Sequence, residues 1–237
     1  MKGFLYKDLY YSKVSFIAIL IIQIVCSAFI IAAAIAENVL QEPILYVLAS
    51  VGGYFITFLL SPSLMTDYFQ KDESKNWNHF AVTVPDGVTG IVQSKYIVMI
   101  LVQIFVSFCC VITDAIGMVI YPEGGSFTII IMLLLIYNMF KISVQIPLAF
   151  YAGVKKGVQL SDLLLLVVAF VGFIYALFGD ISMFLEGDFW NGFMKMLTEG
   201  AAIWILAVLP WIALFCLWVS FQISVKNYRK GVERRDE

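Results

Sequence analysis

Six long apolar stretches with very few charges are the feature that most constrains how this chain can fold. They cover residues 14–36, 44–66, 96–119, 127–151, 160–179 and 201–225. Each has about the 20 residues that an α-helix needs to cross roughly 30 Å of hydrocarbon, and none alternates in polarity like a transmembrane β-strand. Only 14% of the 237 residues are charged, against about 25% in a soluble domain. The sequence therefore predicts an all-α integral membrane protein with six transmembrane helices in a single domain, residues 1–237.

The basic residues between these stretches lie almost entirely on one side of the predicted membrane. Thirteen of the 15 lysines and arginines precede the first span, follow the sixth, or connect spans two to three and four to five. The opposite side carries mostly acidic residues: Glu37, Glu42, Glu123, Asp180, Glu186, Asp188 and Glu199. Because cytoplasmic loops are enriched in Lys and Arg, both termini are predicted to be cytoplasmic in a multi-pass plasma-membrane protein. The net charge of −2 gives no electrostatic basis for binding nucleic acid.

Two segments outside the spans have the composition of helices that lie at a membrane surface. Residues 1–13 interleave Phe, Leu and Tyr with three lysines, which predicts an interfacial helix on the cytoplasmic side. Residues 180–200, on the outer side, are too apolar for a free loop and are interrupted by Gly187 and Gly192. They are predicted to form a re-entrant or surface-lying helical hairpin.

The cytoplasmic connection at residues 67–95 is long and mixes charges with large aromatic side chains. Phe69, Glu73, Trp77 and Phe80 recur at roughly helical spacing, which predicts a short amphipathic helix. Exposed aromatic residues would suit a surface that docks another protein, because aromatics dominate interface hot spots. They would equally suit a helix lying among lipid headgroups, and the residues alone leave these two alternatives open.

Polar side chains form a stripe on each of the third and fourth predicted spans. The members of the two stripes are Gln103, Ser107 and Asp114 on the third, and Asn138, Lys141 and Gln145 on the fourth. Spacings of three, four or seven residues put each set on one helix face. Charged groups within a membrane are costly and mark functional sites by default, so the stripes could line a translocation path. They could instead hydrogen-bond to one another as structural contacts between helices.

The sequence lacks the motifs of several catalytic classes. It has no GxxxxGK[ST] phosphate-binding loop, no HExxH zinc motif and no GxSxG nucleophile motif, and its one histidine is His79. ATP hydrolysis and metalloprotease chemistry by this chain are therefore not expected. The residues leave open a channel or secondary carrier, with Asp114 as the acidic residue within a span. A further alternative is an intramembrane enzyme.

Two regions carry a family resemblance. Residues 1–10 read MKGFLYKDLY, and the cytoplasmic connection reads KDESKNW over 71–77, AVTVP over 81–85 and IVQSKY over 91–96. This basic and aromatic start ending in Lys-Asp, followed by these three elements, resembles small type-2 permeases of ATP-binding-cassette (ABC) transporters. The sequence departs from the family pattern at Asp86 and Gly87, where a basic or Ser/Arg turn is usual.

The resemblance implies a partner and a role for each of these regions. Residues 1–13 would be an elbow helix, residues 183–197 an outer hairpin, and residues 69–80 a coupling helix that docks on a cytoplasmic ABC ATPase. The coupling residues would be Phe69, Lys71, Glu73, Lys75, Trp77, His79 and Phe80. Such permeases pair with themselves or with a sister permease and bind two ATPase subunits, which hold the ATP and Mg; this chain would bind no cofactor. Small Gram-positive members export amphipathic peptides, which implies a bacterial exporter with a hydrophobic or amphipathic substrate.

Overall fold

The computed structural model describes residues 2–40, 44–65, 69, 87–164, 166 and 201–233. These residues contain α-helices and one short 3-10 helix, and no β-strand occurs among them. The elements are α1 (Lys2–Leu40), α2 (Ile44–Met65), α5 (Gly87–Ile120), η1 (Pro122–Gly124), α6 (Thr128–Ala152) and α10 (Ala201–Glu233). A further helical stretch covers residues 154–164. The described part of the chain is therefore all-helical.

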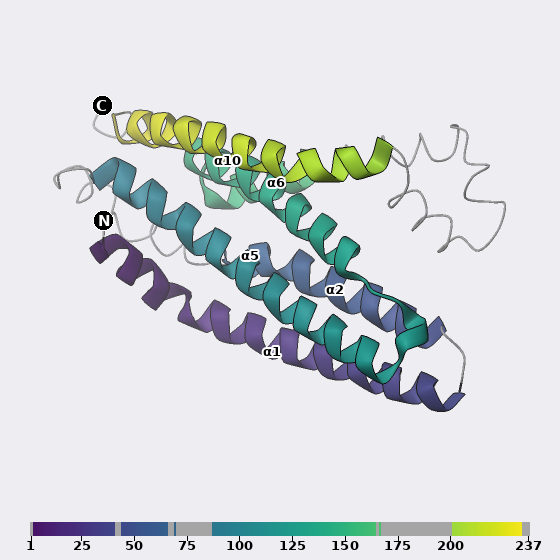
Figure 1. Cartoon of the computed structure of the whole chain (residues 1–237). Helices are drawn as coiled ribbons and strands as arrows, with labels where there is room; N and C mark the ends of the chain where they lie inside the picture. Colours follow the sequence, from purple (N-terminus) through teal and green to yellow (C-terminus); the bar gives the residue numbers. More distant parts are fainter. Residues whose placement is uncertain are drawn as a thin grey trace.

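The consecutive helices α1, α2, α5 and α6 alternate in direction, and both chain ends lie at one end of the bundle (Figure 1). We call this end the terminal end; it holds the start of α1, the start of α5, and the last turns of α2, α6 and α10. The opposite end, here the hairpin end, holds the short connections from α1 to α2 and from α5 to α6. Lys7 lies near the start of α1, Lys95 in the first third of α5 and Lys155 just after the end of α6, so these lysines lie toward the terminal end.

Five helices of the described ranges are long and apolar enough to cross a membrane. They correspond to the first, second, third, fourth and sixth predicted spans, which supports a multi-pass helical membrane protein. Of the predicted fifth span, residues 160–164 are helical and most of the remainder lies outside the described residues. The predicted outer hairpin, at residues 180–200, also lies outside them.

Two helices begin earlier than hydropathy predicts. Helix α1 is continuous from Lys2 to Leu40, where the sequence predicted an interfacial helix followed by a separate span. Helix α5 starts at Gly87 rather than near residue 96. Both extensions carry polar residues, and they pack against each other: the ring of Phe4 lies directly against Gly90 at this crossing, and Asp8 and Ser12 of α1 are buried, although Tyr6 and Tyr10 on its other face are exposed. Hydropathy identifies only the apolar part of a helix, which favours contact with lipid. It therefore underestimates the length of a helix that continues beyond that part and packs against another helix.

The helices pack in two groups. Helix α1 packs most extensively against α2 and α5, and α6 packs most extensively against α10, whereas the contacts of α5 and α2 with α6 are smaller. The buried core includes Val92, Met99 and Val102 of α5 and Ile142 and Ile146 of α6. Many remaining apolar side chains, on α1 and α10 above all, face outward. In a membrane protein an outward apolar surface is expected, because lipid is the solvent there.

Candidate functional site

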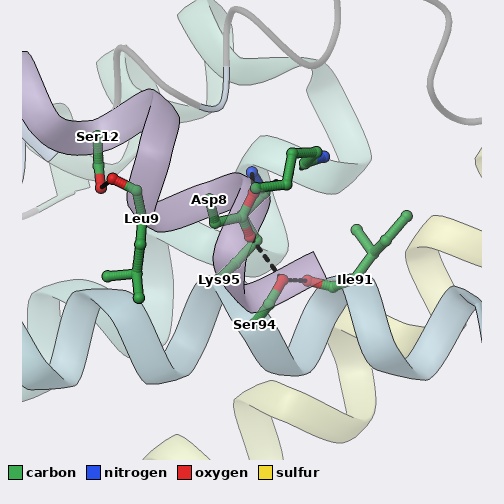
Figure 2. A network of polar contacts seen from close by, with 7 residues as sticks. Asp8, Leu9, Ser12, Ile91, Ser94 and Lys95 are labelled. Carbon is green, nitrogen blue, oxygen red and sulfur yellow. Dashed lines mark hydrogen bonds and ion pairs between the residues drawn. The ribbon is translucent and has the colours of Figure 1, made fainter. Parts of the chain in front are cut away.

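A buried polar cluster joins α1 to α5 at the terminal end (Figure 2). Lys95 Nζ lies 3.0 Å from Asp8 Oδ1, and Ser94 Oγ donates a hydrogen bond of 2.5 Å to Asp8 Oδ2. Asp8 is 0% exposed and Lys95 is 1% exposed. An unpaired buried charge is very costly, and Asp8 is stabilised here by Lys95, by the Ser94 hydroxyl and by a second lysine, Lys7, whose Nζ lies 3.7 Å from Asp8 Oδ1.

The local helix structure places these side chains on facing surfaces. Ser94 Oγ also lies 2.8 Å from the Ile91 carbonyl oxygen, a second acceptor within reach of its single hydroxyl hydrogen, and the Ser12 hydroxyl, one turn after Asp8, donates to the Leu9 carbonyl at 3.1 Å. Figure 2 shows Asp8 projecting from α1 toward Ser94 and Lys95 on α5. The cluster therefore brings together the two regions that carry the family resemblance, namely the Lys-Asp near the N-terminus and the Ser-Lys-Tyr at the start of the third predicted span.

Phe69 is the one predicted coupling residue that the structure describes. Its side chain is only 5% exposed. The Lys95 ammonium lies 4.9 Å from the centre of the Phe69 ring, within cation–π range. The ring also packs against Phe150 of α6, with centroids 6.0 Å apart, and Phe150 contacts Tyr228 of α10 at 5.3 Å. Phe69 thus faces into the bundle and not outward toward a docked protein.

The other six predicted coupling residues lie outside the described part of the chain. They are Lys71, Glu73, Lys75, Trp77, His79 and Phe80. Their assignment to a docking helix stays a prediction.

The two predicted polar stripes meet at a cluster in the middle of the bundle. Asn138 donates to the Gln103 side-chain oxygen at 2.9 Å, and Gln103 bonds Ser61 of α2 at 3.0 Å. Asn138 also donates to the Phe58 carbonyl at 2.8 Å. That carbonyl is four residues before Pro62, which has no N–H to bond it within the helix. Asn138 therefore satisfies a backbone group that the proline leaves free, which favours the structural alternative for this pair.

A second proline-freed carbonyl is satisfied in the same manner between α6 and α10. Pro147 frees the carbonyl of Ser143, and Ser220 donates to it at 2.5 Å. Because the Ser220 hydrogen is used there, the 2.5 Å contact between Ser220 and Tyr96 has the tyrosine hydroxyl as its donor. The sequence predictions did not include Ser220. Its acceptor could have been located, because a carbonyl four residues before a proline within a span lacks its usual helical N–H donor.

Asp114 lies at the hairpin end and closes the turn that follows α5. It is 1% exposed, and it accepts hydrogen bonds from the Phe127 main-chain N–H at 3.1 Å and from the Ser126 and Thr128 hydroxyls at 3.0 Å. These donors surround the start of α6, where a negative charge is favoured by the helix dipole. Asp114 is thus held by local contacts, and no lysine contacts it among the described residues.

Glu37 has a comparable position at the connection from α1 to α2. Its Oε1 accepts the Tyr46 main-chain N–H at 2.6 Å, and the side chain is buried. The sequence placed Glu37 among outer-face acids but did not predict its burial or its role at the start of α2.

The remaining stripe residues have separate surroundings. Lys141 pairs with Asp162 at 3.0 Å, which links α6 to the helical stretch at 154–164. Ser107 bonds the Gln103 carbonyl of its own helix at 2.7 Å. Gln145 is buried, and neither polar atom of its side chain has a hydrogen-bond partner within the described ranges. The six residues therefore do not form one continuous polar surface in the described structure.

Among the described residues, no group of three or more His, Cys, Asp or Glu that could hold a metal ion is found. What the buried polar groups do is connect helices: α1 to α5 at the terminal end, α2 to α5 and α6 in the middle, and α6 to α10. In the described structure, therefore, buried polar side chains hold apolar helices of a membrane protein against one another.

Comparison with protein families places this bundle in a particular class. The sequence model of the family described as ABC-2 family transporter protein matches residues 3–229. Because this match covers nearly the whole chain, the protein belongs to the ABC-2 transporter family, whose members are membrane transport components that act with an ATP-binding subunit. Searches of curated proteins and of solved structures found no match.

Proposed function

We propose that this chain is the permease subunit of an ABC exporter that moves a hydrophobic or amphipathic substrate, a peptide, out of the cell. The observation that carries the proposal is the family match over residues 3–229, joined to five helices long enough to cross a membrane within the described ranges. ATP binding by a partner subunit would supply the energy, and two permease chains would form the transport unit. The basic residues predict that the terminal end faces the cytoplasm, where the partner would bind.

A path along the outside of the bundle, between two chains, suits this proposal better than a path through it. The described polar side chains inside the bundle are mostly engaged in contacts between helices, such as Gln103 with Asn138. The outward faces are apolar: Ile24 and Phe29 on α1 and Trp211 and Phe215 on α10 are all more than half exposed. An apolar seam would favour a substrate with an apolar face. The peptide nature of the substrate rests on the resemblance to small Gram-positive exporters.

Co-purification tests the proposal. The tagged permease would be extracted from its native membranes in mild detergent, and the bound proteins identified by mass spectrometry. We expect an ATP-binding subunit with a phosphate-binding loop, together with ATPase activity that falls when the permease is omitted. The double variant Trp77→Ala/Phe80→Ala should insert normally and lose the ATP-binding subunit. A permease that purifies alone, and stimulates no ATPase, would contradict the proposed function.

A further inference from the structure

Five buried side chains between the hairpin end and the middle of the bundle each have a polar atom without a hydrogen-bond partner within the described ranges. We call them the axial row. The atoms are Glu37 Oε2 of α1, the Tyr46 hydroxyl, Ser50 Oγ and the Tyr54 hydroxyl of α2, and Asn138 Oδ1 of α6. Each of these residues is 0% or 1% exposed. Buried polar atoms are nearly always bonded to protein or to ordered water, so five together in one region require an explanation.

The three members on α2 lie on one face of that helix. Tyr46, Ser50 and Tyr54 are four residues apart, so they follow one another at about 6 Å along the helix. The rings of Tyr46 and Tyr54 both contact the ring of Phe127, with centroids 5.6 and 6.4 Å apart. A Cβ atom on Gly117 would overlap the Tyr46 hydroxyl, so this hydroxyl lies against α5. The face therefore points into the bundle, toward α5 and the start of α6.

The two ends of the axial row are held by other contacts. Glu37 Oε1 accepts the Tyr46 main-chain N–H at 2.6 Å, which leaves Oε2 as the atom without a partner at the hairpin end. Asn138 donates to the Phe58 carbonyl at 2.8 Å, and Phe58 is one turn after Tyr54. The Asn138 oxygen therefore lies about one further turn along α2, in the middle of the bundle.

The chemistry and spacing of the axial row indicate its ligand. All five atoms are oxygens, and the three hydroxyls can both donate and accept. Because the members on α2 are about 6 Å apart along the helix, a single cation with ligands at about 2.3–2.6 Å could not contact them all. Several water molecules could, since a bridging water spans ~5.6 Å with two hydrogen bonds. Water also has the size and the two to four bonding directions that a buried polar site requires.

We propose that the axial row is a binding site for a file of internal water molecules, which connects Glu37 at the hairpin end to Asn138 in the middle of the bundle. The waters bond the three hydroxyls of α2 and the free oxygens at both ends. This half of α2 is then joined to its neighbours through water, whereas Ser61, in the middle, bonds Gln103 of α5 directly at 3.0 Å. Because every member is buried, the file is enclosed and is not a passage for substrate.

Hydroxyl-radical labelling tests for these waters, because X-rays generate the radicals from water itself and the radicals modify the side chains beside it. The purified wild-type permease in detergent micelles would be irradiated, and the modified residues identified by mass spectrometry. Tyr96 is the matched control: it is 5% exposed, but its hydroxyl bonds Ser220 and Ser224 of α10. We expect labelling of Tyr46 and Tyr54, and only background labelling of Tyr96.

A stability measurement gives opposite signs with and without a bound water. Tyr54→Phe removes only the hydroxyl. If water binds there, the water loses one partner, and the apparent melting temperature should fall by about 2–4 °C, the shift for one hydrogen bond in a chain of this size. If the hydroxyl has no ligand, its removal relieves a desolvation cost and the melting temperature should rise. Tyr151→Phe, at a tyrosine of α6 that is 70% exposed, should leave it unchanged.

Either of two results would overturn the inference: labelling of Tyr46 and Tyr54 no stronger than that of Tyr96, or a Tyr54→Phe variant at least as stable as the wild type. If Tyr54→Phe does not accumulate in the membrane, Ser50→Ala makes the same test on the central hydroxyl of the row. Neither measurement requires an ATP-binding partner, so the inference stands or fails independently of the proposed function.

Discussion

At the hairpin end, buried carboxylates bind main-chain groups close by in the sequence. Glu37 accepts the N–H of Tyr46, nine residues on, and Asp114 accepts the N–H of Phe127, 13 residues on. At the terminal end, the closest partners of Asp8 are side chains remote in the sequence: Ser94 and Lys95 lie 86 and 87 residues away, whereas the adjacent Lys7 is farther from the carboxylate, at 3.7 Å. The two ends therefore bury the same chemical group in different ways.

This difference predicts how far the effect of losing each carboxylate contact should spread through the bundle. A carboxylate that binds the first residues of the next helix stabilises one connection between two consecutive helices. A carboxylate paired with a distant lysine holds together two helices that are not consecutive, and Lys95 extends that contact to Phe69. Damage at the hairpin end should loosen one turn, and damage at the terminal end should affect the packing of several helices.

The largest expected effect comes from breaking the Asp8–Lys95 pair. Lys95→Met removes the nearer cation and leaves the buried Asp8 carboxylate with Ser94 and with Lys7, whose Nζ lies 3.7 Å away. Loss of one partner of a buried ion pair costs about 3–5 kcal/mol, and because Lys7 compensates part of the charge, the free energy of unfolding should fall by an amount near the lower end of that range. It is measured by denaturant titration of the purified protein in detergent micelles.

The matched control replaces both partners with apolar residues. Asp8→Leu combined with Lys95→Met leaves no unpaired charge, and apolar replacements of buried pairs are often neutral. The double variant should therefore be more stable than Lys95→Met alone. Equal stability of the two variants would show that the pair does not hold the terminal end together.

An intermediate effect is expected at the hairpin end. Asp114→Ala removes the acceptor for the Phe127 N–H and for two hydroxyls, and hydrogen bonds to a charged group contribute about 1.5–3 kcal/mol. The free energy of unfolding should fall by about 2–3 kcal/mol. Hydrogen exchange measured by mass spectrometry should increase at residues 121–130 and remain near wild-type levels at residues 87–95. Increased exchange spread equally over both segments would break the distinction between the two ends.

The smallest effect is expected between α6 and α10. Ser220→Ala leaves the Ser143 carbonyl without the donor that replaces the missing N–H of Pro147, at a cost of about 1 kcal/mol. In a Pro147→Ala background, residue 147 supplies its own N–H and the cost should approach zero. A Ser220→Ala effect of the same size in both backgrounds would show that the proline-freed carbonyl is not the reason for this contact.

The sequence predicted the apolar segments of the helices well and the polar segments at the starts of α1 and α5 poorly. Apolar length identified the spans that correspond to α1, α2, α5, α6 and α10, because hydropathy measures the preference for hydrocarbon. The interleaved aromatic residues and lysines of residues 1–13 predicted a separate interfacial helix before the first span, whereas α1 is continuous from Lys2. Residues 87–95 were assigned to a connection because they precede the apolar stretch, although α5 already begins at Gly87.

The candidate residues show what a linear pattern can and cannot identify. The stripes singled out Gln103, Asn138 and Asp114, which are all buried and hydrogen-bonded. A carbonyl freed by a proline can be located four residues before that proline, but which side chain binds it depends on how the helices cross, and an N–H at a helix start leaves no mark in a pattern of side chains. Asp8 was predicted to lie in a surface helix, since its pairing with Lys95 depends on how two distant helices cross.

The separation between Asp8 and Lys95 also sets an order of events during synthesis. The 87 residues between them take about 4–17 s to translate at typical rates of 5–20 residues per second. The hairpin-end contact of Glu37 spans nine residues and can form roughly ten times sooner. Each hairpin can therefore close as its second helix is made, while Asp8 stays hydrated at the membrane surface until α5 is inserted and supplies its cation.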